Sequence, residues 1–107
     1  MAITIQREGP HSVIISVTGQ FDYRVKDEIQ KLVASMGGFA RYCFDFGETS
    51  RLHSTGVGLL IGLRQQLGGS RANVCLSNCG EEIMQVLAQA GVLNLFTVYP
   101  AVARASA

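Results

Sequence analysis

Two hydroxyl residues at the start of a long apolar segment are the residues of this chain best placed to do chemistry. The stretch His53-Ser54-Thr55-Gly56 follows an apolar run and a polar loop, and it precedes a segment with helical spacing. The first N–H groups of a helix have no partner within that helix, so they can hold an anion. A hydroxyl at this place either caps the helix or accepts a phosphoryl group. Spacing alone favours the cap, which commonly contributes about 1 kcal/mol.

The other reactive side chains do not form a recognisable set. Cys75 and Cys79 could be imagined with His53 as a metal site, but their spacing supports this weakly, and buried inert thiols are commoner. The chain shows no carboxylate pair, no phosphate loop with lysine and no nucleophile elbow. We therefore expect no metal, no cofactor and no enzyme. A hydrolase that uses Ser54 is a third possibility, and active-site serine probes would test it.

Composition excludes several classes of function. The chain has 107 residues, a formal net charge of +1 and 16% charged residues, which fits one globular domain over residues 1–107. Without a basic patch or a stacking platform, we expect no nucleic-acid partner. Three cysteines without CxxC spacing fit a reducing compartment. No apolar stretch is long enough to cross a bilayer and no signal peptide is recognisable, so we expect a cytoplasmic protein without membrane contact.

Strand-like and helix-like segments alternate along the chain. Asp22 is a plausible N-cap for the first helix, and the second helix is apolar over a wide arc. Helices of this length between strands imply crossovers and a partly parallel sheet. We predict an α/β domain with a mixed central sheet of four to five strands, covered by three to four helices, the fourth in the alanine-rich tail after Pro100. The expected strands are near 3–5, 13–18, 42–46, 72–76 and 98, and the expected helices are 23–36, 54–67 and 81–90.

Two glycines inside the second helix need an explanation. Gly58 and Gly62 lie one turn apart, opposite the apolar arc, and each costs roughly 1 kcal/mol against alanine. Either they let the helix approach another element closely, or they form a flat strip for a partner. Sequence does not choose between these two explanations.

Four short motifs in register resemble the STAS domain family, which includes the anti-anti-sigma factors of bacteria. The segment from His53 to Gly58 (HSTGVG) resembles the family pattern [D]-S-[S/T]-G-[L/V]-G at the start of an apolar helix. Gly19-Gln20-Phe21-Asp22 is similar to the G-x-[L/F]-D element after the second strand. The pair Gly68-Gly69 and the closing segment from Ala90 to Phe96 also match, so the resemblance covers nearly the whole chain.

The resemblance implies a STAS fold and a reversible binding switch. Such domains bind an anti-sigma factor, often a serine kinase of the histidine-kinase-like ATPase type, and a metal-dependent serine phosphatase reverses the phosphorylation. Carried over to this chain, Ser54 is the phosphoacceptor and Thr55 is a second candidate. The partner-binding residues would be Asp22, His53, Ser54, Thr55, Gly56, Gly58 and Gly62, and Asp22 could both cap its helix and contact the partner.

His53 departs from the family pattern, which has aspartate at this position. A carboxylate would repel a phosphate, whereas an imidazole can donate a hydrogen bond to it and titrates near physiological pH. A solvated loop histidine is the simpler interpretation. The departure makes a partner outside sigma control more plausible. The alternative function is a constitutive interaction module or a small-ligand-binding module, in a signalling assembly or associated with transport, with Ser54 only a helix cap.

Overall fold

The computed structural model describes residues 2–35, 41–69 and 73–101. A mixed sheet forms one layer, and three α-helices and one short 3-10 helix (η1) lie among the described residues. The strands are β1 (Ala2–Arg7), β2 (Ser12–Phe21), β3 (Arg41–Asp45), β4 (Thr49–Leu52), β5 (Val74–Cys79) and β6 (Thr97–Pro100). The helices are η1 (Tyr23–Val25), α1 (Lys26–Ser35), α2 (Ser54–Gln66) and α3 (Glu81–Gln89).

Strand β2 is the centre of the sheet's connectivity. The path through the sheet is β1-β2-β3-β5-β6, in which only the β1–β2 pair is antiparallel. The far end of β2 leaves β3 and pairs in parallel with β4, with a shift of register between Gly19 and Gln20. This bend brings the end of β2 beside the strand that leads into α2.

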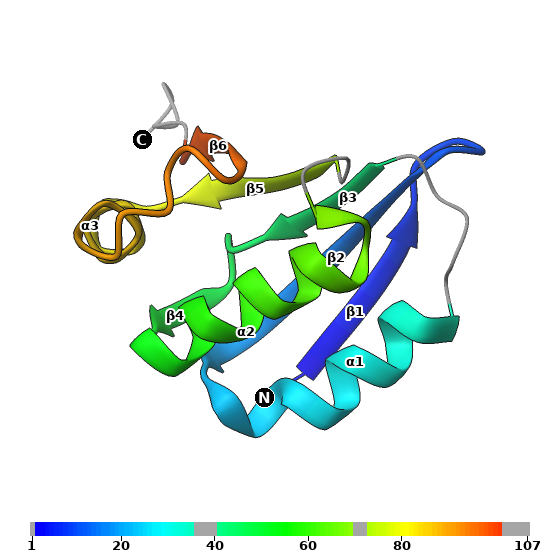
Figure 1. The fold of residues 1–107 in the computed structure, drawn as a ribbon, viewed down its shortest axis with the longest axis horizontal. Helices are drawn as coiled ribbons and strands as arrows, with labels where there is room; N and C mark the ends of the chain where they lie inside the picture. The colour runs from blue at the N-terminus through cyan, green and yellow to red at the C-terminus, as the bar shows by residue number, and fades with distance from the viewer. Residues whose placement is uncertain (1, 36–40, 70–72, 102–107) are drawn as a thin grey trace.

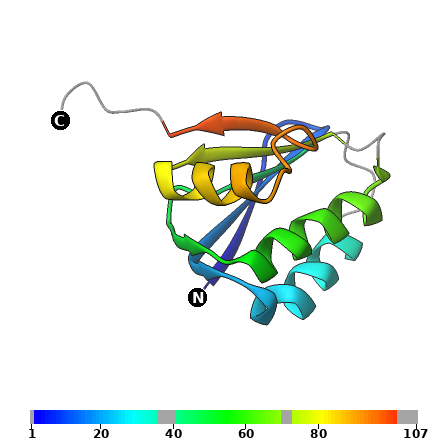
Figure 2. The ribbon, with the colours of Figure 1, turned by 60° about the vertical axis from the view of Figure 1, so that its left-hand side comes forward.

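The helices bury one face of the sheet, as Figures 1 and 2 show for α1 and α2, which lie side by side. Alternate residues of the inner strands point to this face, because side chains in a strand alternate between the two faces. Residues from all three α-helices complete one hydrophobic cluster with them. The cluster includes Ile15, Val17, Phe44, Val74 and Leu76 from the sheet and Ile29, Leu60, Leu63, Ile83 and Leu87 from the helices.

The other face of the sheet carries the residues in between. Ile14, Cys43 and Asp45 are half-buried, and among the described residues no helix packs against them. In the described part of the chain, this second face has mixed polarity and remains partly open to solvent.

The α/β class, the mixed sheet and the three helices are confirmed, while several boundaries differ from expectation. Among the described residues the sheet has six strands rather than the expected four to five, because the polar loop expected before His53 is wrong over Thr49–Leu52, where the chain pairs with the end of β2. The first expected helix begins as η1 and becomes α-helical only from Lys26, and β5 continues to Cys79. The alanine-rich tail lies almost entirely outside the described residues. No helix in the described part of the chain has the length and apolarity needed to cross a bilayer.

Candidate functional site

Asp22 organises the loop between β2 and α1. Its carboxylate accepts a hydrogen bond from the Arg24 backbone N–H at 2.9 Å, which caps η1 as the sequence predicts. The same carboxylate accepts from the Arg24 side chain, with Nη2 and Oδ2 2.7 Å apart. These hydrogen bonds hold the pKa of Asp22 below its usual value. Asp22 is buried, whereas the Arg24 side chain is about half exposed, so a partner would meet Arg24 rather than the carboxylate.

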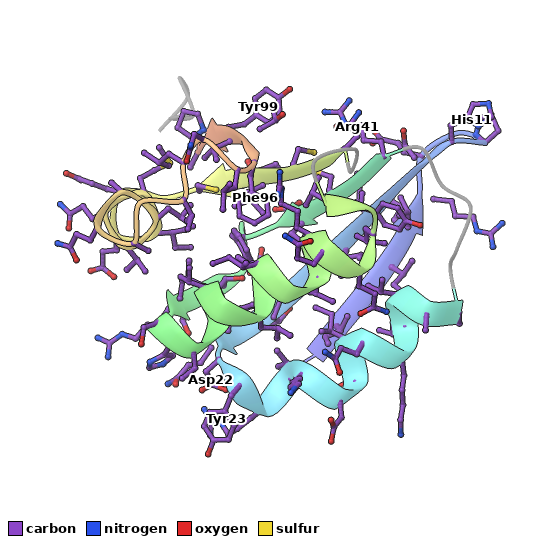
Figure 3. The ribbon with its side chains drawn as sticks, viewed as in Figure 1. His11, Asp22, Tyr23, Arg41, Phe96 and Tyr99 are labelled. Atoms are coloured by element: carbon purple, nitrogen blue, oxygen red, sulfur yellow. The ribbon has the colours of Figure 1, made fainter. Side chains whose placement is uncertain are left out.

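The start of α2 is attached to this loop by two hydrogen bonds. The His53 N–H donates to the Phe21 carbonyl oxygen at 3.0 Å, and the Tyr23 N–H donates to Thr55 Oγ1 at 3.1 Å. The Thr55 hydroxyl therefore has a structural partner. Figure 3 shows Asp22 and Tyr23 at the end of the sheet where α1 begins, and the hydrogen bonds place the first turn of α2 beside them.

Gly56 is required for this contact. A Cβ atom built on Gly56 would collide with the Phe21 carbonyl oxygen and lie 2.6 Å from Phe21 Cδ1. The helix therefore approaches the end of β2 more closely than any side chain permits.

Ser54 is the first residue of α2, and His53 is the N-cap. The expectation that Ser54 could be the cap itself is wrong, because its backbone is already helical and His53 holds the extended conformation of a cap. The His53 side chain makes no capping hydrogen bond. Ser54 is exposed, and its hydroxyl has no hydrogen-bond partner among the residues that the structure describes.

His53 is tied to the neighbouring strand rather than being a freely solvated loop residue. Its Nε2 lies 3.0 Å from Oε1 of Gln20, and Nη2 of Arg24 donates to the same oxygen at 3.4 Å. His53 is half-buried. The imidazole, the Gln20 amide and the Arg24 guanidinium therefore form one polar cluster beside the start of α2.

Gly58 and Gly62 face open space. Within the described part of the chain, a Cβ atom added at either glycine would meet nothing within 4 Å. Close approach to another element therefore does not explain them. They line a groove between α1 and α2 together with Tyr23, Lys26, Gln30, Thr55 and Leu59. Tyr23 is 65% exposed, which is the largest exposure among the large hydrophobic side chains at this end of the sheet.

A second hollow lies on the other side of Ser54. Arg51, His53 and Ser54 line it from the β4–α2 side, and Glu82, Gln85 and Gln89 line it from α3. Sequence reasoning missed Arg51 and α3 here because it treated β4 as a loop. Leu52 is preceded by three polar residues without alternation, so the sequence contains almost no local signal for this strand.

A third hollow, of about 620 Å³, lies elsewhere. It is bounded by the ends of β3 and β5 and the start of α3, and Asp45, Glu48, Glu81 and Glu82 make it acidic. Cys75, Cys79 and His53 do not come together as a metal site, and the described residues contain no group of three or more potential ligands in a metal-binding arrangement.

Comparisons with known proteins agree on one family. The sequence model of the STAS domain matches residues 2–105. A STAS-domain containing protein of Pseudomonas aeruginosa is 28% identical over 100 residues, which are 92% of this chain and 99% of that protein.

Solved structures extend the likeness in fold. A putative anti-sigma factor antagonist of Thermotoga maritima has a TM-score of 0.80 at 13% identity, covering 94% of this chain and 87% of that one. The phosphorylated form of the Bacillus cell fate determinant SpoIIAA has a TM-score of 0.69 at 19% identity, covering 98% and 94%. A sulfate transporter family protein of Wolinella succinogenes has a TM-score of 0.76 at 14% identity, covering 91% and 83%.

Proposed function

Because this chain belongs to the STAS domain family, whose members are typically non-catalytic regulatory modules, we propose that it is a regulatory binding protein switched by phosphorylation of Ser54. The unphosphorylated form binds an anti-sigma factor or serine kinase of the histidine-kinase-like ATPase type, or another regulator. Phosphorylation releases this partner, and a metal-dependent serine phosphatase restores binding.

The proposal rests on the difference in hydrogen bonding between the Ser54 and Thr55 hydroxyl groups. Ser54 is exposed and unbonded among the described residues, whereas Thr55 accepts a hydrogen bond from the Tyr23 backbone. A phosphoryl group on Ser54 breaks no hydrogen bond of the fold. The same group on Thr55 would crowd the contact between α2 and the Asp22 loop, so Ser54 ranks first.

Electrostatics explain why the fold tolerates the modification. A phosphoserine brings about −1.5 to −2 charges at neutral pH. The helix N-terminus favours negative charge by roughly 0.3–1 kcal/mol. Arg51 and His53 line the same hollow as Ser54 and add donors, while Glu82 lies across it. The domain therefore stays folded when Ser54 is phosphorylated.

The charge of the phosphate would weaken the binding of a partner, although it does not unfold the domain. The proposed binding surface comprises Tyr23, the first turn of α2 and the strip formed by Gly58 and Gly62. An added phosphate within this surface would be desolvated in a close complex, which costs several kcal/mol when no counter-charge is supplied. Binding is lost although the fold is kept, as a switch requires.

The first test is the phosphorylation state of the protein purified from its own host. We expect the intact mass to include a fraction with one phosphoryl group, and peptide mapping to place it on Ser54. Thr55→Ala is the matched control and should keep the phosphoryl group, whereas Ser54→Ala should lose it. A chain that stays unmodified under every growth condition would instead be a constitutive interaction module.

The second test is calorimetry with the partner that co-purifies with the protein. Ser54→Ala should bind as the unphosphorylated protein does, and Ser54→Glu should bind much more weakly. Equal affinities of these two folded variants would contradict the switch.

A further inference from the structure

We propose that Cys43 and Cys75 form a redox-sensitive thiol pair, which a small peroxide converts to an intramolecular disulfide. This inference does not depend on the function of Ser54. The pair lies on the sheet face that the described helices leave uncovered, and it belongs to a different part of the molecule from the start of α2.

The register of the sheet places the two cysteines side by side. Cys43 on β3 is directly paired with Cys75 on the parallel strand β5, so both side chains point to the same face. Neighbouring strands lie about 4.8 Å apart, which is within the Cα separation of about 4.4–6.8 Å that a disulfide spans. Both thiols are free in this structure. The bond can therefore form without moving either strand far.

Arg41 gives this pair an unusual electrostatic environment. Its Nη2 lies 3.6 Å from the Cys75 sulfur, and the Cys43 sulfur lies 3.5 Å from Oγ of Ser77. The neighbouring Cys43 thiol and the Arg41 guanidinium together lower the pKa of Cys75 to about 6. The same interaction with Cys75 raises the pKa of Cys43. One proton therefore leaves the pair of thiols easily, and the remaining proton is shared between the two sulfurs.

Access for a small oxidant is available at Cys43. Cys43 is half-buried and lines a small hollow with Ile14, Ser12 and Arg41, whereas Cys75 is buried. A peroxide has the size to enter such a hollow, but a large reagent does not. Figure 3 shows Arg41 at the opposite end of the sheet from Asp22 and Tyr23, so oxidation would leave the α1–α2 groove intact.

The reaction balances with hydrogen peroxide as the oxidant. One sulfur attacks a peroxide oxygen, the O–O bond breaks, and a sulfenic acid forms with release of one water. The second sulfur displaces the hydroxyl group of the sulfenic acid, and a second water leaves as the S–S bond forms. The two sulfurs together lose two electrons to the peroxide, and both thiol protons end in water.

Cys79 is the internal control. It lies on the same strand but belongs to the hydrophobic core, and burial raises its pKa to about 11. No cysteine lies opposite Cys79 in the register of the described strands. Cys79 should therefore remain a thiol when Cys43 and Cys75 are oxidised.

The experiment treats the folded protein with hydrogen peroxide, then denatures it, alkylates the remaining thiols and maps the peptides. We expect a mass loss of two hydrogens, a Cys43–Cys75 link and an alkylated Cys79. Cys79→Ser should form the link at the same rate, and Arg41→Gln should form it roughly tenfold more slowly at pH 7 because less thiolate is present. A link that involves Cys79, or oxidation without any intramolecular link, would overturn the proposal.

A second measurement covers the case in which a cysteine variant fails to fold. The unmodified protein is titrated with arsenite, a small reagent whose trivalent arsenic bridges two adjacent thiols. We expect one adduct for each chain, mapped to Cys43 and Cys75 and released by a small dithiol. A folded protein that forms neither this adduct nor the disulfide does not contain the pair that we propose.

Discussion

Replacing Gly58 and Gly62 with alanine tests whether the strip along α2 exists for a partner. Both glycines lie in the interior of α2, and an added methyl group would meet nothing within 4 Å in the described structure. The fold gains nothing from either glycine. We propose that their cost to helix stability is offset by a partner that packs onto the strip.

The size of the effect follows from helix propensity. Glycine is about 0.8–1.0 kcal/mol less favourable than alanine in a helix interior, so each replacement should raise the free energy of unfolding by nearly this amount. For a domain of this size, 1 kcal/mol corresponds to about 4–8 °C in Tm. The two sites are one turn apart but make no contact with other elements, so the double variant should gain close to the sum.

Gly56→Ala is the control with the opposite sign. Its added methyl group collides with the Phe21 carbonyl oxygen. Overpacking of this kind typically lowers the free energy of unfolding by about 1–3 kcal/mol. Urea denaturation of the three single variants should therefore separate them clearly. Gly58→Ala and Gly62→Ala should unfold at higher urea concentration than the wild type, and Gly56→Ala at lower.

Binding to the co-purified partner decides the functional half of the prediction. Gly58→Ala and Gly62→Ala should weaken binding by about tenfold or more, since a methyl group in a close-packed interface forces the partner away. Lower stability of these variants would refute our description of α2 as open along this strip. Higher stability with unchanged affinity would show that the strip is exposed but is not part of the interface.

Three further predictions concern single groups. The pKa of Asp22 is lowered in the folded state. The ionised carboxylate therefore stabilises the fold above the unfolded pKa of about 3.9, and this stabilisation is lost as the pH falls through the folded pKa. Asp22→Asn should flatten the acid limb of a curve of unfolding free energy against pH. Thr55→Val removes the acceptor of one backbone N–H and should cost roughly 0.5–1.5 kcal/mol in urea denaturation, whereas Ser54→Ala should cost less because its hydroxyl is unbonded among the described residues. Thiolate absorbance of the folded protein should show a first ionisation at a pH of about 6, and a midpoint near that of a free cysteine would contradict the pairing of Cys75 with Cys43.

Local signals in the sequence predicted the elements and the cap, and they did so for physical reasons. Asp22 caps η1 through a backbone N–H only two residues away, so neighbouring residues decide this contact. The apolar arc of α2 likewise follows from helical periodicity, and the buried residues Val57, Leu60 and Leu63 confirm it. The family resemblance then implied the STAS fold and the candidate site residues.

Contacts between distant segments could not be predicted in the same way. Strand β4 has four residues, too few for periodicity to distinguish it from a loop, and it exists because the bent end of β2 lies beside it. The contact of His53 with Gln20 and the pairing of Cys43 with Cys75 join residues more than 30 positions apart. Each depends on the register of parallel strands, which the sequence does not specify locally.

The collision at Gly56 separates two kinds of information within one short motif. The glycine is a steric requirement of the way in which α2 rests on the end of β2, so any chain with this packing needs it whether or not it is phosphorylated. The serine two residues earlier is under no such requirement, because within the described structure the fold makes no use of its hydroxyl. A related chain could therefore keep the glycine and lose the switch. When distant relatives are compared, the glycine reports the architecture, and only the residue at the position of Ser54 reports the regulation.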